Sequence, residues 1–92
     1  MIINFIKIIN ITFEIKKHIG NLTNKEEGLW NVELNVISWN GGAPKFDIRS
    51  WSPDHSKCGK GITMSGEELR NLKNLLNGSE EIFDINGEKL VF

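Results

Sequence analysis

The feature that most constrains the fold of this chain is the strict alternation in the segment KFDIRSW, residues 45–51. Every second residue from Lys45 to Trp51 lies on one side of an extended chain, while Phe46 and Ile48 lie on the other. A period of two predicts a β-strand and does not suit an amphipathic helix. The turn sequence NGGAP, residues 40–44, precedes this strand. We therefore expect an antiparallel hairpin between residues 45–51 and the apolar segment that ends at residue 39.

Three further segments complete the predicted sheet. Residues 11–19 alternate apolar and polar side chains, which indicates a half-buried strand. Residues 29–39 are rich in β-branched and aromatic residues and predict the second strand, although its apolar side chains fall on both faces. A bulge or strong bend in that strand would reconcile them. A short fourth strand is expected over residues 61–64, after the polar loop SPDHSKCGKG.

A helix follows the fourth strand directly. Ser65 and Glu68 have the spacing of a capping box, and Gly78 is suited to end the helix. Between them, leucines recur at helical spacing, at positions 69, 72, 75 and 76. Four strands and one helix make an α+β domain in which one sheet face stays open to solvent. If Phe46 and Ile48 pack against the leucines, Lys45, Arg49 and Trp51 project from the open face.

Length and cysteine content limit the alternatives. The chain has 92 residues, enough for one domain, and its single cysteine, Cys58, excludes an intramolecular disulfide. A reducing, cytoplasmic location is therefore expected. The apolar run MIINFIKIINITF is interrupted by polar residues and is much shorter than the roughly 20 residues that span a bilayer, so neither a signal peptide nor membrane association is predicted.

Charge is distributed unevenly along the chain, although the net charge is only −1. Residues 1–44 are neutral and residues 65–92 carry a charge of −3. The charge of residues 45–64 is +2, from Lys45, Arg49, Lys57 and Lys60 against Asp47 and Asp54. A nucleic acid responds to such a local patch and not to the total charge. Aromatic rings that stack bases, interleaved with cations, are what a single strand requires.

These residues carry a resemblance to a known family. The segment PKFDIRSWSPDHSKCGKGITMSGEEL, preceded by ELNVISWN, resembles the YdbC-type bacterial branch of the transcriptional coactivator positive-cofactor-four family. The resemblance runs from about Phe13 to Leu76. It implies a strongly curved four-stranded antiparallel sheet followed by one helix (ββββα), a homodimer, and largely sequence-independent binding of single-stranded DNA in transcription regulation, replication or repair.

The resemblance also suggests the binding residues. The family's basic and aromatic sheet positions fall on Lys45, Arg49 and Trp51, with Lys57 and Lys60 in the following loop, and Trp30 and Trp39 fit by residue type. The chain departs from the pattern at Cys58, where an apolar residue is usual, and in the second strand, where relatives are more basic. The expected organisation is an N-terminal extension (1–10), the binding domain (11–77) and a C-terminal extension (78–92).

Other readings stay open at this point. The Asn86-Gly87 pair predicts an extra C-terminal hairpin, which would add strands, lengthen a dimer contact or cover part of a groove. An RNA-binding or RNA-chaperone module and an adaptor that docks RNA polymerase components are the alternative functions. No enzyme, cofactor or metal is predicted, because Asp54, His55 and Cys58 lack the further ligands of a zinc site.

Overall fold

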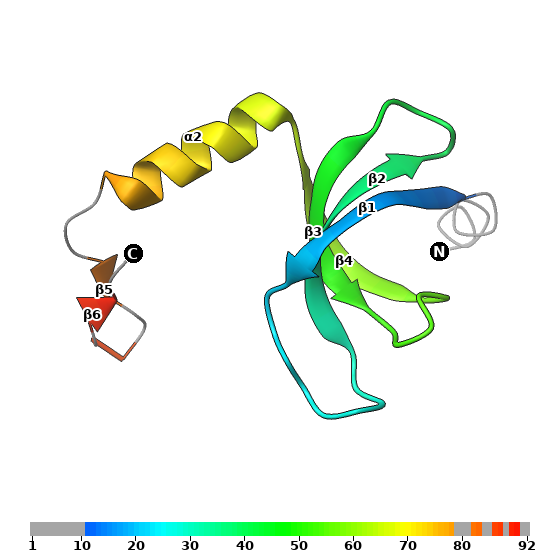
Figure 1. Ribbon diagram of the computed structural model, residues 1–92, viewed down its shortest axis with the longest axis horizontal. Coiled ribbons are helices and arrows are strands. Elements are labelled where there is room, and N and C mark those ends of the chain that lie inside the picture. The colour runs from blue at the N-terminus through cyan, green and yellow to red at the C-terminus, as the bar shows by residue number, and fades with distance from the viewer. Residues whose placement is uncertain (1–10, 79–81, 84–85, 88, 91–92) are drawn as a thin grey trace, which may run out of the picture.

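The computed structural model describes residues 11–78, 82–83, 86–87 and 89–90. Its main part is an antiparallel sheet in the order β1-β2-β3-β4, formed by Phe13–Asn21, Asn31–Trp39, Lys45–Trp51 and Cys58–Met64. The helix α2, Gly66–Asn77, follows β4 (Figure 1). The predicted four-stranded sheet with one C-terminal helix is confirmed, and β3 has the predicted bounds.

The turn between β2 and β3 forms as its sequence predicts. Asn40 and Gly41 both have positive φ, 51° and 73°, and the Gly42 N–H donates to the Trp39 carbonyl at 2.8 Å. Positive φ at both central residues is the backbone of a type I′ turn, whose twist matches that of the flanking strands. The turn therefore sets the register of the hairpin, in which Ile37 lies opposite Lys45.

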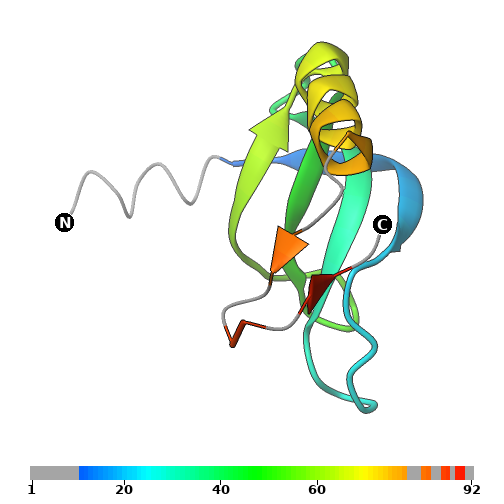
Figure 2. The ribbon, with the colours of Figure 1, turned by 90° about the vertical axis from the view of Figure 1, so that its left-hand side faces the viewer.

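The sheet is strongly bent, and the irregular residues lie in its two edge strands. Register shifts occur in β1 between Ile15 and Lys17 and again between His18 and Gly20, so β1 carries two extra residues relative to β2. Of the two features expected in β2, a bulge or a strong bend, the bulge is absent, because β2 pairs with β3 without a shift. Bulges bend a strand and increase its twist. Figures 1 and 2 show the resulting curved sheet, with α2 on its convex side.

The curvature gives the sheet two unlike faces. The concave inner face carries Glu33, Asn35, Ile37 and Trp39 of β2 and, opposite them on β3, Arg49 and Asp47. Asn35, Ile37 and Asp47 are fully buried there, although no helix or strand of the described residues packs across this face. The convex outer face carries apolar side chains that stay partly or fully exposed, namely Val32, Leu34, Val36, Phe46, Ile48 and Ile62.

The fourth strand lies very close to β3. A Cβ at Gly61 would collide with the Cβ of Arg49 and the carbonyl oxygen of Ile48, so only glycine fits at this position. β4 begins at Cys58, which pairs with Trp51, three residues before the predicted start at Gly61. The expected irregular loop is accordingly shorter and covers residues 52–57.

The helix begins as predicted but packs differently. Ser65 accepts a hydrogen bond from the Glu68 N–H, and the Glu68 carboxylate accepts one from the Ser65 N–H, which completes the capping box. Gly78 is the C-cap. No residue of α2 is buried, and Leu75 is 70% exposed. The prediction that the leucines form part of the core is therefore wrong for the single chain, because α2 extends away from the sheet after its first turn (Figure 1).

The C-terminal extension contains the predicted hairpin. Strand β5, Ile82–Phe83, pairs antiparallel with β6, Lys89–Leu90, and Gly87 between them has a φ of +85°. The pair forms a two-stranded sheet of its own and does not extend the main sheet. The predicted N-terminal extension, residues 1–10, lies outside the described residues. Among the described helices, none is long and apolar enough to span a membrane.

Candidate nucleic-acid interface

An aromatic cluster closes one end of the inner face. The ring of Trp51 lies 4.9 Å from that of Phe13, 6.4 Å from that of Trp39 and 5.7 Å from that of His55, measured between centroids. Trp51 is 1% exposed. The prediction that it projects into solvent is wrong, because the curved sheet folds its inner face over the ring. In this conformation Trp51 supports the rings around it and is not itself open to a base.

Arg49 is also held inside the inner face. Its Nε and one terminal nitrogen donate to the two carboxylate oxygens of Asp47 at 2.7 and 2.8 Å, and its guanidinium lies 4.6 Å from the Trp39 ring centroid. The side chains of Arg49 and Asp47 are 16% and 0% exposed. Burial alone lowers the pKa of Arg49, but the hydrogen bonds and charge of Asp47 outweigh it and raise that pKa. Arg49, which was predicted to be free to bind a phosphate, is therefore paired with Asp47.

The remaining predicted cations are exposed. Lys45 begins β3 beside the turn, Lys57 ends the β3–β4 loop, and Lys60 lies in β4. Among the described residues, the side chains of Lys57 and Lys60 form no ion pair. These two lysines therefore keep an ammonium group available to a phosphate.

The loop that carries Lys57 is built by short polar side chains. The Ser52 hydroxyl accepts from the Lys57 N–H at 3.0 Å, and Asp54 accepts from the Ser56 N–H and hydroxyl at 3.0 and 2.7 Å. These Ser56 hydrogen bonds, with a further one from Ser52, lower the pKa of the Asp54 carboxyl to about 2. Local bonds of this kind fix a turn without a hydrophobic core. Lys57 is consequently held in one place at the loop end.

A hollow of about 500 Å³ lies beside this loop. Its lining includes the rings of Phe13, Trp30 and Trp39 together with Lys57, and Ile11, Ser56 and Cys58 complete it. Phe13 and Trp30 are 39% and 38% exposed. A second hollow of about 410 Å³ shares Trp30 and Lys57 with the first. The structure thus brings together three of the predicted residues, Trp30, Trp39 and Lys57.

Phe13 is the aromatic residue that the sequence analysis did not single out. It lies opposite Trp39 in the β1–β2 register, and the two ring centroids are 5.8 Å apart. The available signal was its place in the first strand's alternation, on the same side as Ile15. The alternation shows on which side of the strand Phe13 lies. It does not show that Phe13 lies opposite Trp39, because that depends on how the two strands pair.

Comparison with known proteins agrees with this architecture. Residues 27–75 match the family described as Transcriptional Coactivator p15 (PC4). The chain belongs to the PC4 family. The matched residues run from the start of β2 through most of α2 and include the β3–β4 loop, whereas β1 with Phe13 lies before them.

A relative from the spirochaete Treponema pallidum (strain Nichols) extends the similarity. It is described only as an uncharacterized protein and is 48% identical over 65 residues, which cover 71% of this chain and 75% of the relative. Membership of the PC4 family points to single-stranded nucleic acid as the general ligand class. In the described part of the chain, no three His, Cys, Asp or Glu side chains are placed to hold a metal ion.

Proposed function

We propose that this protein binds single-stranded DNA without catalysis and with little sequence preference, in transcription regulation, replication or repair. The observation that carries the proposal is the hollow between Phe13, Trp30 and Trp39 with Lys57 beside it. Exposed rings stack any base, and a neighbouring ammonium group neutralises a phosphate. Family membership supports the same ligand class.

The predicted site residues, together with Phe13, fall into an exposed and a covered group. Trp30, Trp39 and Phe13 offer ring surface, and Lys45, Lys57 and Lys60 offer exposed charge. Arg49 and Trp51 lie beneath them and support the platform, since the Arg49 guanidinium stacks on Trp39 and the Trp51 ring contacts Phe13. Arg49 therefore acts on binding through the position of Trp39.

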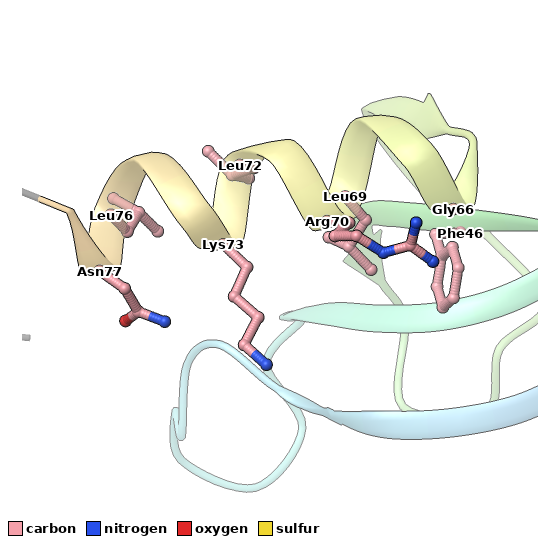
Figure 3. A pocket seen from close by; sticks show the side chains of 8 residues that line it. All are labelled: Phe46, Gly66, Leu69, Arg70, Leu72, Lys73, Leu76 and Asn77. Carbon is pink, nitrogen blue, oxygen red and sulfur yellow. The ribbon is translucent and has the colours of Figure 1, made fainter.

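We further propose that the protein is a homodimer. A groove of about 570 Å³ runs along α2 beside Phe46 of β3, and its apolar lining residues are Phe46, Leu69, Leu72 and Leu76. Figure 3 shows the side chains that line it. The outer sheet face continues this apolar surface. A helix without buried residues gains stability when a partner covers such surface, and a small domain has little core of its own.

The proposal is tested by fluorescence anisotropy of a labelled single-stranded DNA 20-mer, a matched duplex and a matched RNA. We expect tight binding of the single strand alone among the DNA probes. Trp30→Ala should weaken it by about 5- to 150-fold, the equivalent of about 1 to 3 kcal/mol for one stacked base. Lys57→Ala and Lys60→Ala should each lower the log-log salt slope by about 0.7.

Matched controls separate the site from a general loss of structure. Leu29→Ala removes the exposed apolar neighbour of Trp30 that does not line the hollow, and Lys16→Ala removes a lysine that is paired with Glu14. Both should leave affinity unchanged. Preference for ribose at matched sequence would favour the RNA-binding alternative, and failure to bind all three probes at low salt would leave the adaptor alternative.

A further inference from the structure

The two histidines of this chain meet at one carboxylate. The chain contains only His18 and His55, which lie 37 positions apart. The Nε2 of His55 is 3.0 and 2.8 Å from the two carboxylate oxygens of Glu33, and the Nδ1 of His18 is 3.4 Å from one of them. The Glu33 side chain is only 7% exposed.

Hydrogen bonding fixes which ring nitrogen carries a proton. The Asn35 amide nitrogen donates to Glu33 at 3.0 Å, so the amide oxygen of Asn35 faces the Nδ1 of His18, at 2.7 Å. An amide or carboxylate oxygen only accepts, and both histidine nitrogens that face the cluster are therefore donors. The opposite nitrogen of each ring is left to take up the second proton, and the resulting imidazolium keeps every one of these bonds.

The cluster sets the net charge of the inner face. On this face Glu33 and Asp47 are balanced by Arg49 and Lys45, so the face carries no net charge while both imidazoles are neutral. Each protonation adds one positive charge, and both together give +2. The charged and titratable groups around the cluster, from every element beside it, are His18, Lys25, Glu26, Glu27, Glu33, Asp47, Arg49, Asp54 and His55.

We propose that His18, His55 and Glu33 make nucleic-acid binding dependent on pH. The cluster lines a hollow of about 330 Å³ in the inner face, and the His55 ring contacts Trp51 of the aromatic cluster. Histidine changes its charge between about pH 5 and 8. Lowering the pH across this range adds up to two positive charges to the inner face, which strengthens its attraction for a polyanion. This inference rests on the proposed function, because it concerns control of the same binding surface.

The test measures binding of a labelled oligo-dT 20-mer at pH 8.0 and pH 5.5, at about 0.1 M salt. One added phosphate contact raises affinity about fivefold at this salt concentration, because the log-log slope is about −0.7 per contact. We expect the wild-type protein to bind about 5- to 25-fold more tightly at pH 5.5. The double variant H18N/H55Q keeps a donor near each of the two positions and cannot become charged, so its affinity should change less than about twofold.

The variant Glu33→Gln tests the same proposal independently of the histidines. It removes the negative charge with little change of shape, and it should bind more tightly than wild type at pH 8.0. Circular dichroism at both pH values confirms that each variant is folded. A pH response in H18N/H55Q equal to that of wild type would overturn the inference and leave the proposed function standing. Absence of binding by wild type at both pH values would overturn the two together.

Discussion

The two faces of the sheet reverse the usual relation between polarity and exposure. The inner face buries a carboxylate, an amide and an ion pair, whereas the outer face leaves valine, leucine, isoleucine and phenylalanine side chains partly open. Curvature accounts for the difference, since a concave surface screens its own side chains and a convex one spreads them. The polar groups of the inner face are thus paired within the single chain, whereas the apolar side chains of the outer face are left partly uncovered in it.

Of the changes considered, removal of the Arg49 side chain from the inner face should have the largest effect, and this effect is on the free energy of unfolding. Arg49→Ala leaves the carboxylate of Asp47 buried without its cation, a change that typically destabilises by about 3 to 5 kcal/mol. That is a large share of the roughly 5 to 15 kcal/mol that stabilises a domain, so we expect the variant to unfold at a much lower urea concentration. Urea unfolding followed by tryptophan fluorescence measures the loss.

The matching control for Arg49→Ala is Lys16→Ala, which breaks the exposed pair between Lys16 and Glu14 at 3.1 Å. Exposed pairs contribute about 0 to 1 kcal/mol, so its unfolding midpoint should hardly move. Equal losses in the two variants would show that the inner ion pair is no more important than a surface one.

A charge in the groove of α2 should affect assembly next most strongly. Leu72→Glu places a carboxylate on the apolar surface proposed to be covered in the dimer, where an unpaired charge is costly. We expect at least a tenfold weaker dimer, with the secondary structure of the chain unchanged. Light scattering over a concentration series measures it. Asn71→Glu adds the same charge outside the groove lining, and a comparable effect there would contradict the assignment.

The smallest expected effect concerns the loop that positions Lys57. The folded-state pKa of Asp54 is lowered to about 2, so its bonds to Ser56 and Ser52 are present above the ordinary pKa of 3.8 and are lost as the pH falls through about 2. The protection of the Ser56 amide against hydrogen exchange, taken relative to the intrinsic exchange rate at each pH and followed by NMR between pH 5 and pH 2, should therefore fall in wild type. Asp54→Asn should remove most of that pH dependence, and an unchanged profile would exclude Asp54 as the anchor.

Local sequence signals determined much of the fold. The alternation in β3, the Asn40-Gly41 turn and the Ser65–Glu68 capping box each act over a few residues, and each formed as predicted. The bulges in β1 are different, because a register shift exists only relative to the neighbouring strand. Nothing in the alternation of residues 11–19 specifies it.

The candidate site was predictable in composition but not in arrangement. Lys57, Trp30 and Trp39 lie together as the sequence suggested, whereas Arg49 and Trp51 are covered. Alternation gives the side of a strand on which Trp51 lies, but whether that side is open depends on the curvature of the whole sheet. The contact of His18 and His55 with Glu33 likewise could not be predicted from the sequence. The three residues lie in β1, the β3–β4 loop and β2, and their distances depend on how these segments pack together.

The irregular edge strands have a consequence for how copies of this chain can associate. A flat, regular edge would offer unpaired backbone groups to another strand and invite open-ended aggregation. Here the register shifts lie in β1 and β4, the two outermost strands of the sheet, and neither presents an even row of donors and acceptors. The two edges of the sheet are therefore unsuited to open-ended strand pairing between copies of this chain.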